Sequence, residues 1–470
     1  MTSDVVVVGD LLLDRDVVGT VARVCPDAPV PVMEAETELA RPGGAGLAAA
    51  LLAADGADVT LVAPAADDPA GNRLRDLLEA HGVRLVALRT EGTTREKVRV
   101  RAGGQSLLRL DYGSACPLWG PLPPSVAALV RDANAVLVSD YAGGVTSAAA
   151  VRDVLTARTN PLVWDPHVRG AAAVPGATLV TPNLEEARHL SGADRDGSEP
   201  ARPGRARSAF GAAQMHADRL AQRWQARAVC VTLGTRGALL SYGSGSPLVV
   251  PARAVDGDAC GAGDRFAATV TERLARGDVV STAVQAAVTA ASQFVAAGGS
   301  GTFGERGFDD STDHSADGTG AGVARIDVVR RRGGTVVATG GCFDLLHAGH
   351  VALLQAARRL GDALVVCLNS DESVRRLKGP DRPLVPQADR IRVLQALGCV
   401  DAVAVFDEST PDAVLRSLQP DLWAKGGDYA LHDLPEAAVV AEWGGQTVVL
   451  PYLEGRSTSG LIGAVRERDR

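Results

Sequence analysis

Short apolar runs alternate with longer amphipathic stretches along most of the chain. Apolar runs without polar alternation are typical of strands buried on both faces of a sheet, and the amphipathic stretches are typical of the covering helices. The pattern therefore predicts an α/β fold with a largely parallel, doubly wound sheet. In the first part of the chain we expect strands at 4–9, 58–63, 135–140, 161–165, 177–181, 228–233 and 238–242.

Two segments depart from this rhythm. Residues 17–40 and 84–111 are richer in β-branched residues and in polar–apolar alternation. This pattern predicts a small antiparallel sheet that is separate from the main one. Between the two segments, the glycine-rich turn 42–46 precedes an alanine-rich helix expected at 47–54. The glycines of this turn would let the backbone approach a ligand closely.

A break in composition separates two expected domains. Residues 304–332 are rich in Gly, Asp and Ser and contain few large apolar side chains. Such a segment cannot bury a core, so we expect a flexible linker. The linker divides the 470 residues into predicted domains at 1–303 and 333–470, each long enough to fold around its own core.

The second domain is predicted to open with a βαβ unit. A strand begins at Val336, a helix begins near His347, and a second strand covers 363–368. His347 and His350 share one face of the helix start, beside backbone N–H groups that lack intrahelical partners. This arrangement suits an anion with several oxygens, such as a nucleotide phosphate. Metal ligation is one alternative, but no third ligand stands at a recognisable spacing; two ordinary surface histidines are the other.

Polar residues after strand ends indicate a second phosphate-handling site, in the first domain. Asp10 and Asp14 follow the first strand, where open α/β sheets bind ligands, although turn and cap roles are the alternative. At 258–264 the Gly-Ala-Gly start of a helix offers consecutive N–H groups to a phosphoryl oxyanion. Asp264, at the end of that loop, is placed to accept the proton of an attacking hydroxyl.

Composition and charge restrict the possible partners. The net charge of −8 argues against nucleic acid or an anionic membrane as the main partner. No apolar run reaches the roughly 20 residues of a membrane span, and the strand that begins at Asp4 leaves no room for a signal peptide. Seven scattered cysteines without a CxxC pair are typical of reduced thiols. We therefore expect a cytoplasmic protein.

Lysine is rare in this chain. Of the 48 basic residues, only Lys97, Lys378 and Lys425 are lysines. Lysine carries a compact point charge where arginine carries a planar fork, so these positions could require an ammonium group. Chance survival is the alternative. The glycines near Lys378 and Lys425 favour a functional role for these two.

The stretch GGCFDLLHAGH at 340–350 resembles the signature of the HxGH nucleotidyltransferases. The resemblance implies a Rossmann-like α/β domain that joins a phosphorylated small molecule to the α-phosphate of a nucleoside triphosphate. It implies that His347, His350 and Lys378 are catalytic. The implied nucleotide-binding residues are Gly341, Cys342, Phe343, Asp344, His347, His350, Lys425, Ser457, Thr458 and Ser459.

The first 303 residues resemble the ribokinase-like (PfkB-type) sugar kinases in the order and spacing of several short motifs: Asp10 and Asp14, Gly43-Gly44, Asn183 to Glu186, Thr232 to Gly234, and Asp258 to Asp264. The resemblance implies a doubly wound sheet with a small β lid. The lid often forms the dimer contact in these kinases, so a homodimer is expected. Asp264 would be the general base, and the amides of Gly261–Gly263 would form the anion hole.

The same resemblance assigns two ligand sites. The implied ATP-binding residues are Asn183, Glu186, Thr232, Gly234, Gly261, Ala262 and Gly263. The implied sugar-binding residues are Asp10, Asp14, Gly43, Gly44, Lys97 and Arg109. Glu186 would lie beside the Mg²⁺ that accompanies ATP.

Together the two halves resemble the bifunctional family that joins heptose 7-phosphate kinase to heptose 1-phosphate adenylyltransferase. The shared runs are ARVCPDAPVPV, RPGGAG, TPNLEEA, GCFDLLHAGHVALL, RLKGPDRPL and AKGGDY. The resemblance implies that ATP phosphorylates C1 of D-glycero-D-manno-heptose 7-phosphate. A separate phosphatase then removes the 7-phosphate, and adenylyl transfer from ATP gives ADP-heptose and pyrophosphate.

Three residues depart from the family pattern and leave the sugar and its anomer open. Leu47 stands where these kinases usually have an asparagine that binds sugar hydroxyls. Cys260 replaces a threonine of the anion-hole loop, and His167 replaces a lysine.

Two other functions remain possible at this point. One is a kinase–cytidylyltransferase fusion that acts on another sugar or polyol phosphate, because the residues do not separate adenine from cytosine. The other is a sugar-phosphate-binding regulator on a decayed kinase scaffold. Intact Asp264, His347 and His350 argue against the regulator, since decay should remove such residues first.

Overall fold

The chain forms two compact units. Unit 1 comprises Met1–Gly192, Arg219–Cys230 and Asp256–Phe303, and unit 2 comprises Ala193–Asp218, Val231–Val255 and Gly304–Arg470. The computed structural model describes residues 3–103, 105–114, 116–117, 122–192, 209–253, 255–301, 326, 329–330, 332–427 and 434–451. Most of the expected linker lies outside these ranges, so the boundaries at 303 and 333 stay predictions.

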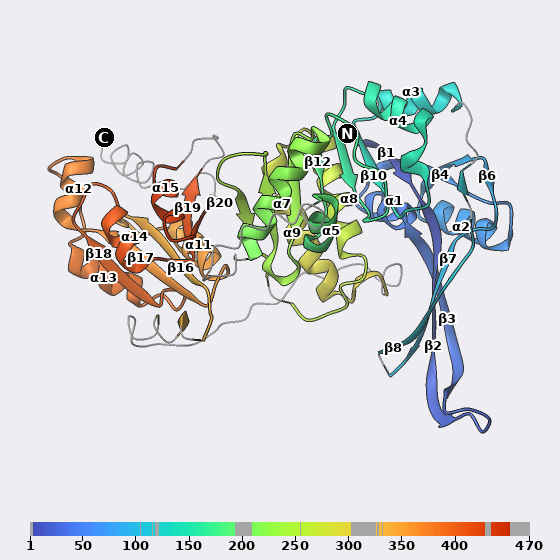
Figure 1. Cartoon of the computed structure of the whole chain (residues 1–470), viewed down its shortest axis with the longest axis horizontal. Helices are drawn as coiled ribbons and strands as arrows, with labels where there is room; N and C mark the ends of the chain where they lie inside the picture. The colour runs from blue at the N-terminus through green and yellow to red at the C-terminus, as the bar shows by residue number, and fades with distance from the viewer. Residues whose placement is uncertain are drawn as a thin grey trace, which may run out of the picture. The chain divides into compact units, whose positions relative to one another are not determined.

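Unit 1 contains a parallel sheet with the strand order β13-β12-β11-β10-β1-β4-β5, except that β13 continues into unit 2 at Val231 (Figure 1). Val5 to Val8 of β1 are at most 2% exposed, which explains their unbroken apolar run. The predicted parallel sheet is confirmed. Its strands are β1 (Asp4–Gly9), β4 (Asp58–Pro64), β5 (Val83–Leu88), β10 (Ala135–Ser139), β11 (Leu162–Asp165), β12 (Leu179–Val180) and β13 (Val229–Thr232).

Helices pack against this sheet, for example α1 against β4 and α8 against β10. Phe266, Val270 and Leu274 on one face of α8 are buried, as their spacing predicts, and α8 packs against α1 and α9. The helices of unit 1 are α1 (Ala45–Ala54), α2 (Pro69–Ala80), α3 (Pro124–Asp132), α4 (Ala149–Ala157), α5 (Leu184–Leu190), α8 (Ala262–Ala275) and α9 (Val280–Ala296), with the short helices η1 (Val145–Ser147) and η3 (Gly299–Gly301).

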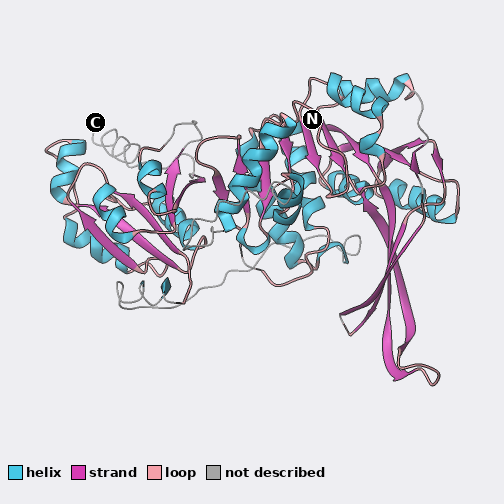
Figure 2. Cartoon of the chain, viewed as in Figure 1, coloured by secondary structure: helices cyan, strands magenta, loops and turns pink. Residues whose placement is uncertain are grey.

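A four-stranded sheet extends from unit 1, and we call it the lid (Figures 1 and 2). Its strand order is β3-β2-β7-β8, formed by β2 (Leu11–Val24), β3 (Pro31–Gly44), β7 (Glu96–Ala102) and β8 (Gln105–Tyr112). A separate antiparallel pair links β6 (Thr90–Glu91) to β9 (Cys116–Pro117).

The predicted extent of the lid was wrong at one end, and one of its pairings is not antiparallel. Residues 84–88 belong to β5, which pairs in parallel with β4 at the edge of the main sheet. Their burial alternates in part, as expected of an edge strand with one face in water, so the pattern resembles that of a lid strand. Within the lid, β2 pairs with β7 in parallel. Asp14 lies inside β2 rather than in a loop after the first strand.

Unit 2 contains a second parallel sheet, with the order β18-β17-β16-β19-β20. The predicted βαβ unit corresponds to β16, α11 and β17. The strands are β16 (Val336–Gly341), β17 (Ala363–Asn369), β18 (Ala402–Phe406), β19 (Leu422–Gly427) and β20 (Gln446–Pro451). The helices are α11 (Ala348–Arg358), α12 (Asp371–Lys378), α13 (Gln387–Gln395), α14 (Asp412–Leu418) and α15 (Glu436–Ala441).

The remaining elements lie in the segments where the chain passes between the two units. Helix α7 (Ala209–Trp224) is divided between them, and η2 (Gly234–Arg236) belongs to unit 2. The strand predicted at 238–242 is present as β14 (Ala238–Ser241), but it pairs antiparallel with β15 (Leu248–Val250). Within the described ranges, no helix combines the length and the hydropathy that a membrane crossing requires.

Gly340 provides a test of packing in the unit 2 sheet. A Cβ added there would lie 2.5 Å from Cη2 of Trp423, whose side chain is fully buried. Gly340→Ala should therefore destabilise this sheet by about 1–3 kcal/mol, the usual cost of overpacking a core. Hydrogen exchange of peptides from β16 and β17, measured by mass spectrometry, would report the loss of protection.

The matched control is Gly427→Ala, because its added Cβ would meet Val449 at an ordinary 3.9 Å. This variant should keep the protection of β16 and β17 close to that of the original chain. Equal exchange in the two variants would contradict the packing argument.

Candidate active sites

Asp264 lies in the first turn of α8, directly after the glycine-rich loop at 261–263. Gly261 caps this helix with a φ of +82°, a left-handed conformation that favours glycine. Asp264 is 6% exposed, and burial raises the pKa of its carboxyl to about 7. A carboxyl group with this pKa can take up a proton near neutral pH.

Tyr141 holds the Asp264 carboxylate, although the sequence did not single it out. Its hydroxyl lies 2.8 and 2.9 Å from the two carboxylate oxygens, and its single proton is shared between them. This hydrogen bond and the charge of Lys97 lower the pKa of Asp264, against the stronger effect of burial and the charge of Asp14. Burial, followed by the charge of Asp264, raises the pKa of the Tyr141 phenol well above its usual value. The hydroxyl therefore keeps its proton and remains a donor.

Asp10 fixes the backbone of the loop that carries Tyr141. Asp10 is 1% exposed, and its carboxylate accepts hydrogen bonds from the N–H groups of Tyr141 (2.9 Å), Gly143 (2.8 Å) and Val145 (3.3 Å). The neighbouring Asp140 accepts from the N–H of Ala142 at 2.8 Å. Asp10 was predicted to bind sugar, and in the structure both of its oxygens accept hydrogen bonds from backbone amides.

Asp14, Gly43 and Gly44 lie together, as the predicted sugar site requires. A Cβ at Gly43 would lie 2.7 Å from Oδ2 of Asp14, and Gly44 has a φ of +60°. Asp14 is 5% exposed and forms an ion pair with Arg99 of β7 at 3.2 Å. The pair connects the lid strands β2 and β7.

A cavity of about 420 Å³ opens beside Arg99. Arg41 pairs with the buried Asp16 at 2.8 Å, and Arg101 lies 3.6 Å from Asp258. Guanidinium groups bind phosphate as planar, charged forks, so this lining suits a phosphorylated ligand. The sequence did not identify these three arginines as a group. The lining residues are Arg41, Arg99, Arg101, Ser106, Gly257, Asp258 and Cys260.

Asn183 and Glu186 form the capping box of α5. The N–H of Glu186 donates to Oδ1 of Asn183, and the N–H of Asn183 donates to Oε2 of Glu186, both at 2.9 Å. Burial raises the pKa of Glu186. Burial, then the charges of Asp264 and Glu186, raises the pKa of Asp165 well above its usual value. The charge of Glu186 thus acts on Asp165, and a divalent cation beside these two carboxyl groups would relieve the repulsion.

Their chemistry fits Mg²⁺, which is held in nucleotide sites by one or two carboxylates together with phosphate oxygens. In the part of the chain that the structure describes, no cluster of three or more side chains forms a complete metal site. The fit is therefore to a cation that shares its ligands with a nucleotide.

Other predicted kinase residues have different surroundings. Nζ of Lys97 lies 5.5 Å from the centroid of the Tyr141 ring, and burial lowers the pKa of this lysine. Arg109 is exposed and forms two hydrogen bonds with Asp111 at the surface. Two predicted ATP-binding residues belong to unit 2, at the end of β13 and the start of η2: Thr232 and Gly234.

The three departures from the family pattern are all located in unit 1. Cδ2 of Leu47 lies 3.1 Å from the position that a Cβ would take at Gly261, so this leucine packs on the anion-hole loop and offers no hydrogen bond to a sugar. Cys260 Sγ accepts a hydrogen bond from Arg99 at 3.6 Å. His167 Nδ1 accepts one from a backbone N–H two residues later, and burial lowers its pKa.

In unit 2, His347 caps α11 by accepting a hydrogen bond from the N–H of Gly349 at 3.1 Å. The rings of His347 and His350 lie 3.9 Å apart at an angle of 34°, and Phe343 lies 5.3 Å from His350. Burial, then the charges of His347 and Lys378, lowers the pKa of His350 to about 4. A bound triphosphate would oppose this shift, because negative charge favours imidazolium.

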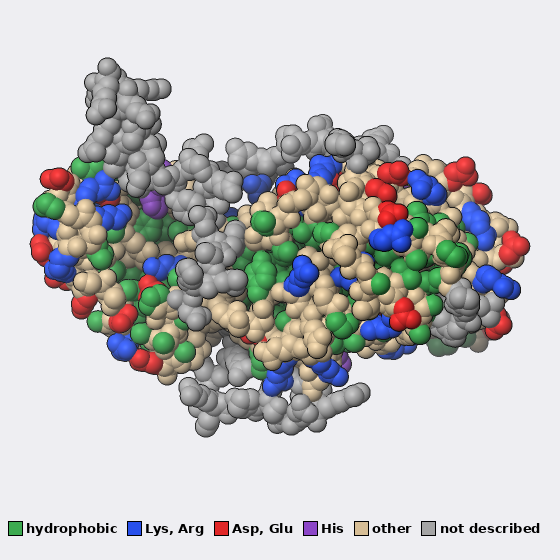
Figure 3. Space-filling model, turned by 90° about the horizontal axis from the view of Figure 1, so that it is seen from above, with side chains coloured by type: hydrophobic (Ala, Val, Ile, Leu, Met, Phe, Trp, Pro, Cys, Tyr) green, Lys and Arg blue, Asp and Glu red, His purple; other side chains and the backbone are tan. Residues whose placement is uncertain are grey.

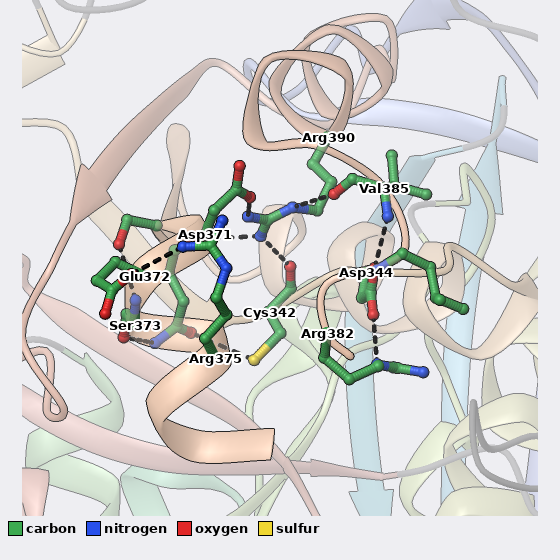
Figure 4. Close-up of polar contacts among 12 residues, drawn as sticks. Cys342, Asp344, Asp371, Glu372, Ser373, Arg375, Arg382, Val385 and Arg390 are labelled. Carbon is green, nitrogen blue, oxygen red and sulfur yellow. Dashed lines mark hydrogen bonds and ion pairs between the residues drawn. The ribbon is translucent and has the colours of Figure 1, made fainter. Parts of the chain in front are cut away.

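Arg390 organises the loop that leads to the histidines (Figure 4). It is 1% exposed and donates to the carbonyls of Cys342 (2.5 Å), Asn369 (2.9 Å) and Val385 (3.0 Å). Its remaining nitrogen pairs with Asp371 at 2.7 Å. One buried guanidinium therefore joins the ends of β16 and β17 to the segment before α13.

Asp344 supports the same region. Its Oδ1 accepts hydrogen bonds from the N–H groups of Leu384 (2.7 Å) and Val385 (3.0 Å), and its Oδ2 pairs with Arg382 at 2.7 Å (Figure 4). Asp344 was predicted to bind nucleotide, and in the structure its carboxylate binds the backbone at 384–385 and the side chain of Arg382. Of the predicted neighbours, Gly341 ends β16 and Cys342 follows it, with Cys342 Sγ 3.7 Å from Oδ1 of Asn369.

The remaining predicted transferase residues divide into three cases. Lys378 is exposed at the end of α12, and its charge acts on His350. Lys425 forms an ion pair with Glu436 at 3.0 Å, with Nζ 5.7 Å from the Trp423 ring. The others lie outside the described residues: Ser457, Thr458 and Ser459.

Two protein families match the chain in succession. The pfkB family carbohydrate kinases match residues 2–305, and the cytidylyltransferase-like family matches residues 338–449. The "Bifunctional protein HldE" of Streptomyces coelicolor is 54% identical and covers 99% of this chain and 97% of its own. The protein of that name from Azorhizobium caulinodans is 38% identical, with 98% of each covered. A ribokinase structure from Thermotoga maritima, 18% identical, has a TM-score of 0.48 and covers 63% of this chain and 93% of its own.

These matches confirm the predicted ribokinase-like and Rossmann-like folds and the predicted fusion of a sugar kinase with a nucleotidyltransferase. The predicted pair of activities, heptose phosphorylation and adenylyl transfer, is confirmed with them. The chain is a bifunctional transferase that uses ATP. It belongs to the family of bifunctional HldE proteins.

Proposed function

We propose that Asp264 is the general base of the kinase reaction. In this reaction O1 of D-glycero-D-manno-heptose 7-phosphate attacks the γ-phosphate of ATP, its proton passes to Asp264, and ADP leaves. The observation that carries this assignment is a buried carboxyl with a pKa near 7 at the start of α8. The amides of Gly261–Gly263 at the start of α8 are proposed to stabilise charge on the transferred phosphoryl group.

The arginine-lined cavity is proposed to bind the 7-phosphate of the sugar. Arg99 joins this cavity to Asp14, the predicted sugar ligand, through their 3.2 Å ion pair. A sugar whose hydroxyls contact Asp14 could thus extend its phosphorylated end toward Arg41 and Arg101. The Mg²⁺ that accompanies ATP would be held by Glu186 and Asp165 and would neutralise phosphate charge.

In the second reaction the phosphate of heptose 1-phosphate attacks the α-phosphate of ATP, and pyrophosphate leaves. We assign His347, His350 and Lys378 to stabilising charge on the triphosphate. Arg390 and Asp344 hold the backbone of the segments that precede α11 and α13. No covalent intermediate on the protein is required, because positioning and electrostatics suffice.

We propose that the enzyme acts in the cytoplasm and that its partners are heptose phosphates and ATP. The lid is proposed to form the contact of a homodimer. Large apolar side chains are exposed on the lid, where a partner could cover them. They are Val21, Val24, Leu39, Leu107, Leu108 and Tyr112, with Val30 in the turn between β2 and β3. On the face shown in Figure 3, acidic and basic side chains are interspersed over the described residues.

Asp264→Asn should lower heptose phosphorylation by about 10²–10⁴-fold, the usual cost of losing a general base. Adenylyl transfer to supplied heptose 1-phosphate should continue, because its proposed residues are in the other unit. Mass spectrometry of both products, with ATP and with CTP, measures the two steps and the nucleotide preference. A variant that phosphorylates heptose 7-phosphate at the original rate would contradict the role of Asp264.

Arg101→Gln should raise the KM for heptose 7-phosphate by about tenfold, since a charge-assisted hydrogen bond contributes about 1.5–3 kcal/mol. The KM for heptose without the 7-phosphate should change little. The matched control is Arg131→Gln, because Arg131 is exposed on α3 and pairs with its neighbour Asp132 at the surface. Equal losses with both sugars would place the phosphate elsewhere.

Leu108→Asp should shift a dimer toward monomers, because it would place a charge on a 52% exposed leucine of β8. Light scattering after size-exclusion chromatography at several concentrations measures the mass. Val279→Asp serves as the control, since Val279 is 64% exposed at the start of α9 and lies outside the lid. An unchanged dimer mass in both variants would contradict a contact through β8.

A further inference from the structure

We propose that Tyr141 is the positioning residue of the kinase: its hydroxyl orients the Asp264 carboxylate and connects that base to the lid. The inference rests on the proposed role of Asp264. Its first support is geometric, because one phenol lies 2.8 and 2.9 Å from the two oxygens of a single carboxylate. A hydroxyl shared between both oxygens limits rotation of the carboxylate, so one orientation is presented to the sugar.

The second support is the rigidity of the Tyr141 backbone. Its N–H donates to Asp10 at 2.9 Å, and its carbonyl accepts from Arg95 at 3.1 Å. The next residue, Ala142, has a φ of +56°, an unusual conformation for a residue with a side chain. Two contacts from different parts of the chain and the turn at Ala142 therefore fix where the ring can point, which a mere surface tyrosine would not need.

The third support is the contact between Tyr141 and the lid. Lys97 of β7 lies over the ring, with Nζ 5.5 Å from its centroid, within the range of a cation–π interaction. Arg95, which binds the Tyr141 carbonyl, directly precedes the same strand. A Cβ at Gly44 would lie 3.4 Å from the Tyr141 ring, so the ring also borders the proposed sugar site. Tyr141 thus touches the lid, the sugar loop and the base.

The charged groups around Asp264 determine the expected pH dependence. Asp14 and Asp165 are acidic neighbours, Lys97 is the basic neighbour, and Tyr141 is the hydrogen-bond donor. The Tyr141 hydrogen bond favours the ionised form of Asp264, so its loss raises the pKa of Asp264 above about 7. Since the base acts when ionised, the acidic limb of activity should move to higher pH.

The test is the pH profile of heptose 7-phosphate phosphorylation by full-length Tyr141→Phe with MgATP. We expect the acidic limb of kcat/KM to move up by about one pH unit or more, because a hydrogen bond to a charged group is worth that much. At pH 7 kcat should fall about tenfold, and the deficit should shrink toward pH 9. The KM for ATP should stay unchanged, because Tyr141 contacts the base and not the proposed nucleotide residues.

Two comparisons make the result decisive. Tyr242→Phe, at a partly exposed tyrosine of unit 2, should leave the profile unchanged. Asp264→Asn separates the role of Asp264 as the base from the role of Tyr141. If Asp264→Asn stays active, the proposed base is wrong. If Asp264→Asn is inactive and the pH profile of Tyr141→Phe is not shifted, only the role of Tyr141 is overturned. A faster Tyr141→Phe enzyme would also overturn it, by showing that the hydroxyl blocks the base.

Discussion

A buried carboxylate that accepts backbone hydrogen bonds is the constraint on which the kinase site depends. Asp10 is almost fully buried and has three N–H donors from the loop at 141–145. A buried charge is costly unless it is paired or hydrogen-bonded, so the loop and the carboxylate require each other. Because the loop cannot relax, Tyr141 meets Asp264, and the orientation of the base becomes a property of the fold.

The nucleotidyltransferase site uses the opposite charge for the same purpose. Arg390 is buried, and its donors bind two carbonyls at strand ends and one in a neighbouring loop. The carbonyls that end a parallel strand have no ladder partner, and a guanidinium satisfies several of them at once. Removing it would leave those groups unpaired beside the loop that precedes His347. Each catalytic region thus contains its own buried charged side chain that binds backbone groups: Asp10 in the kinase and Arg390 in the nucleotidyltransferase.

The sequence predicted local features better than long-range ones. Unbroken apolar runs identify buried strands such as β1, whereas β5 was misassigned because a half-exposed edge strand has the same pattern as a lid strand. Asp264 was predicted because its loop and helix are contiguous. Tyr141 was not, since its partner lies 123 positions away, and neither a tyrosine nor its neighbours form a pattern that indicates such a contact. The partners of Arg390 likewise depend on the packing of separate strands.

The three lysines of this chain have different contacts, so their rarity in the sequence does not have the same meaning at each position. Lys97 lies over the ring that holds the base, with a pKa lowered by burial, so a compact ammonium fits where a guanidinium would compete with Arg99 for Asp14. Lys425 instead pairs with Glu436 beside Trp423, which an arginine could also do. Lys378 is exposed and acts on His350 through its charge. The requirement for lysine is therefore strongest at Lys97, the position whose sequence context had favoured it least.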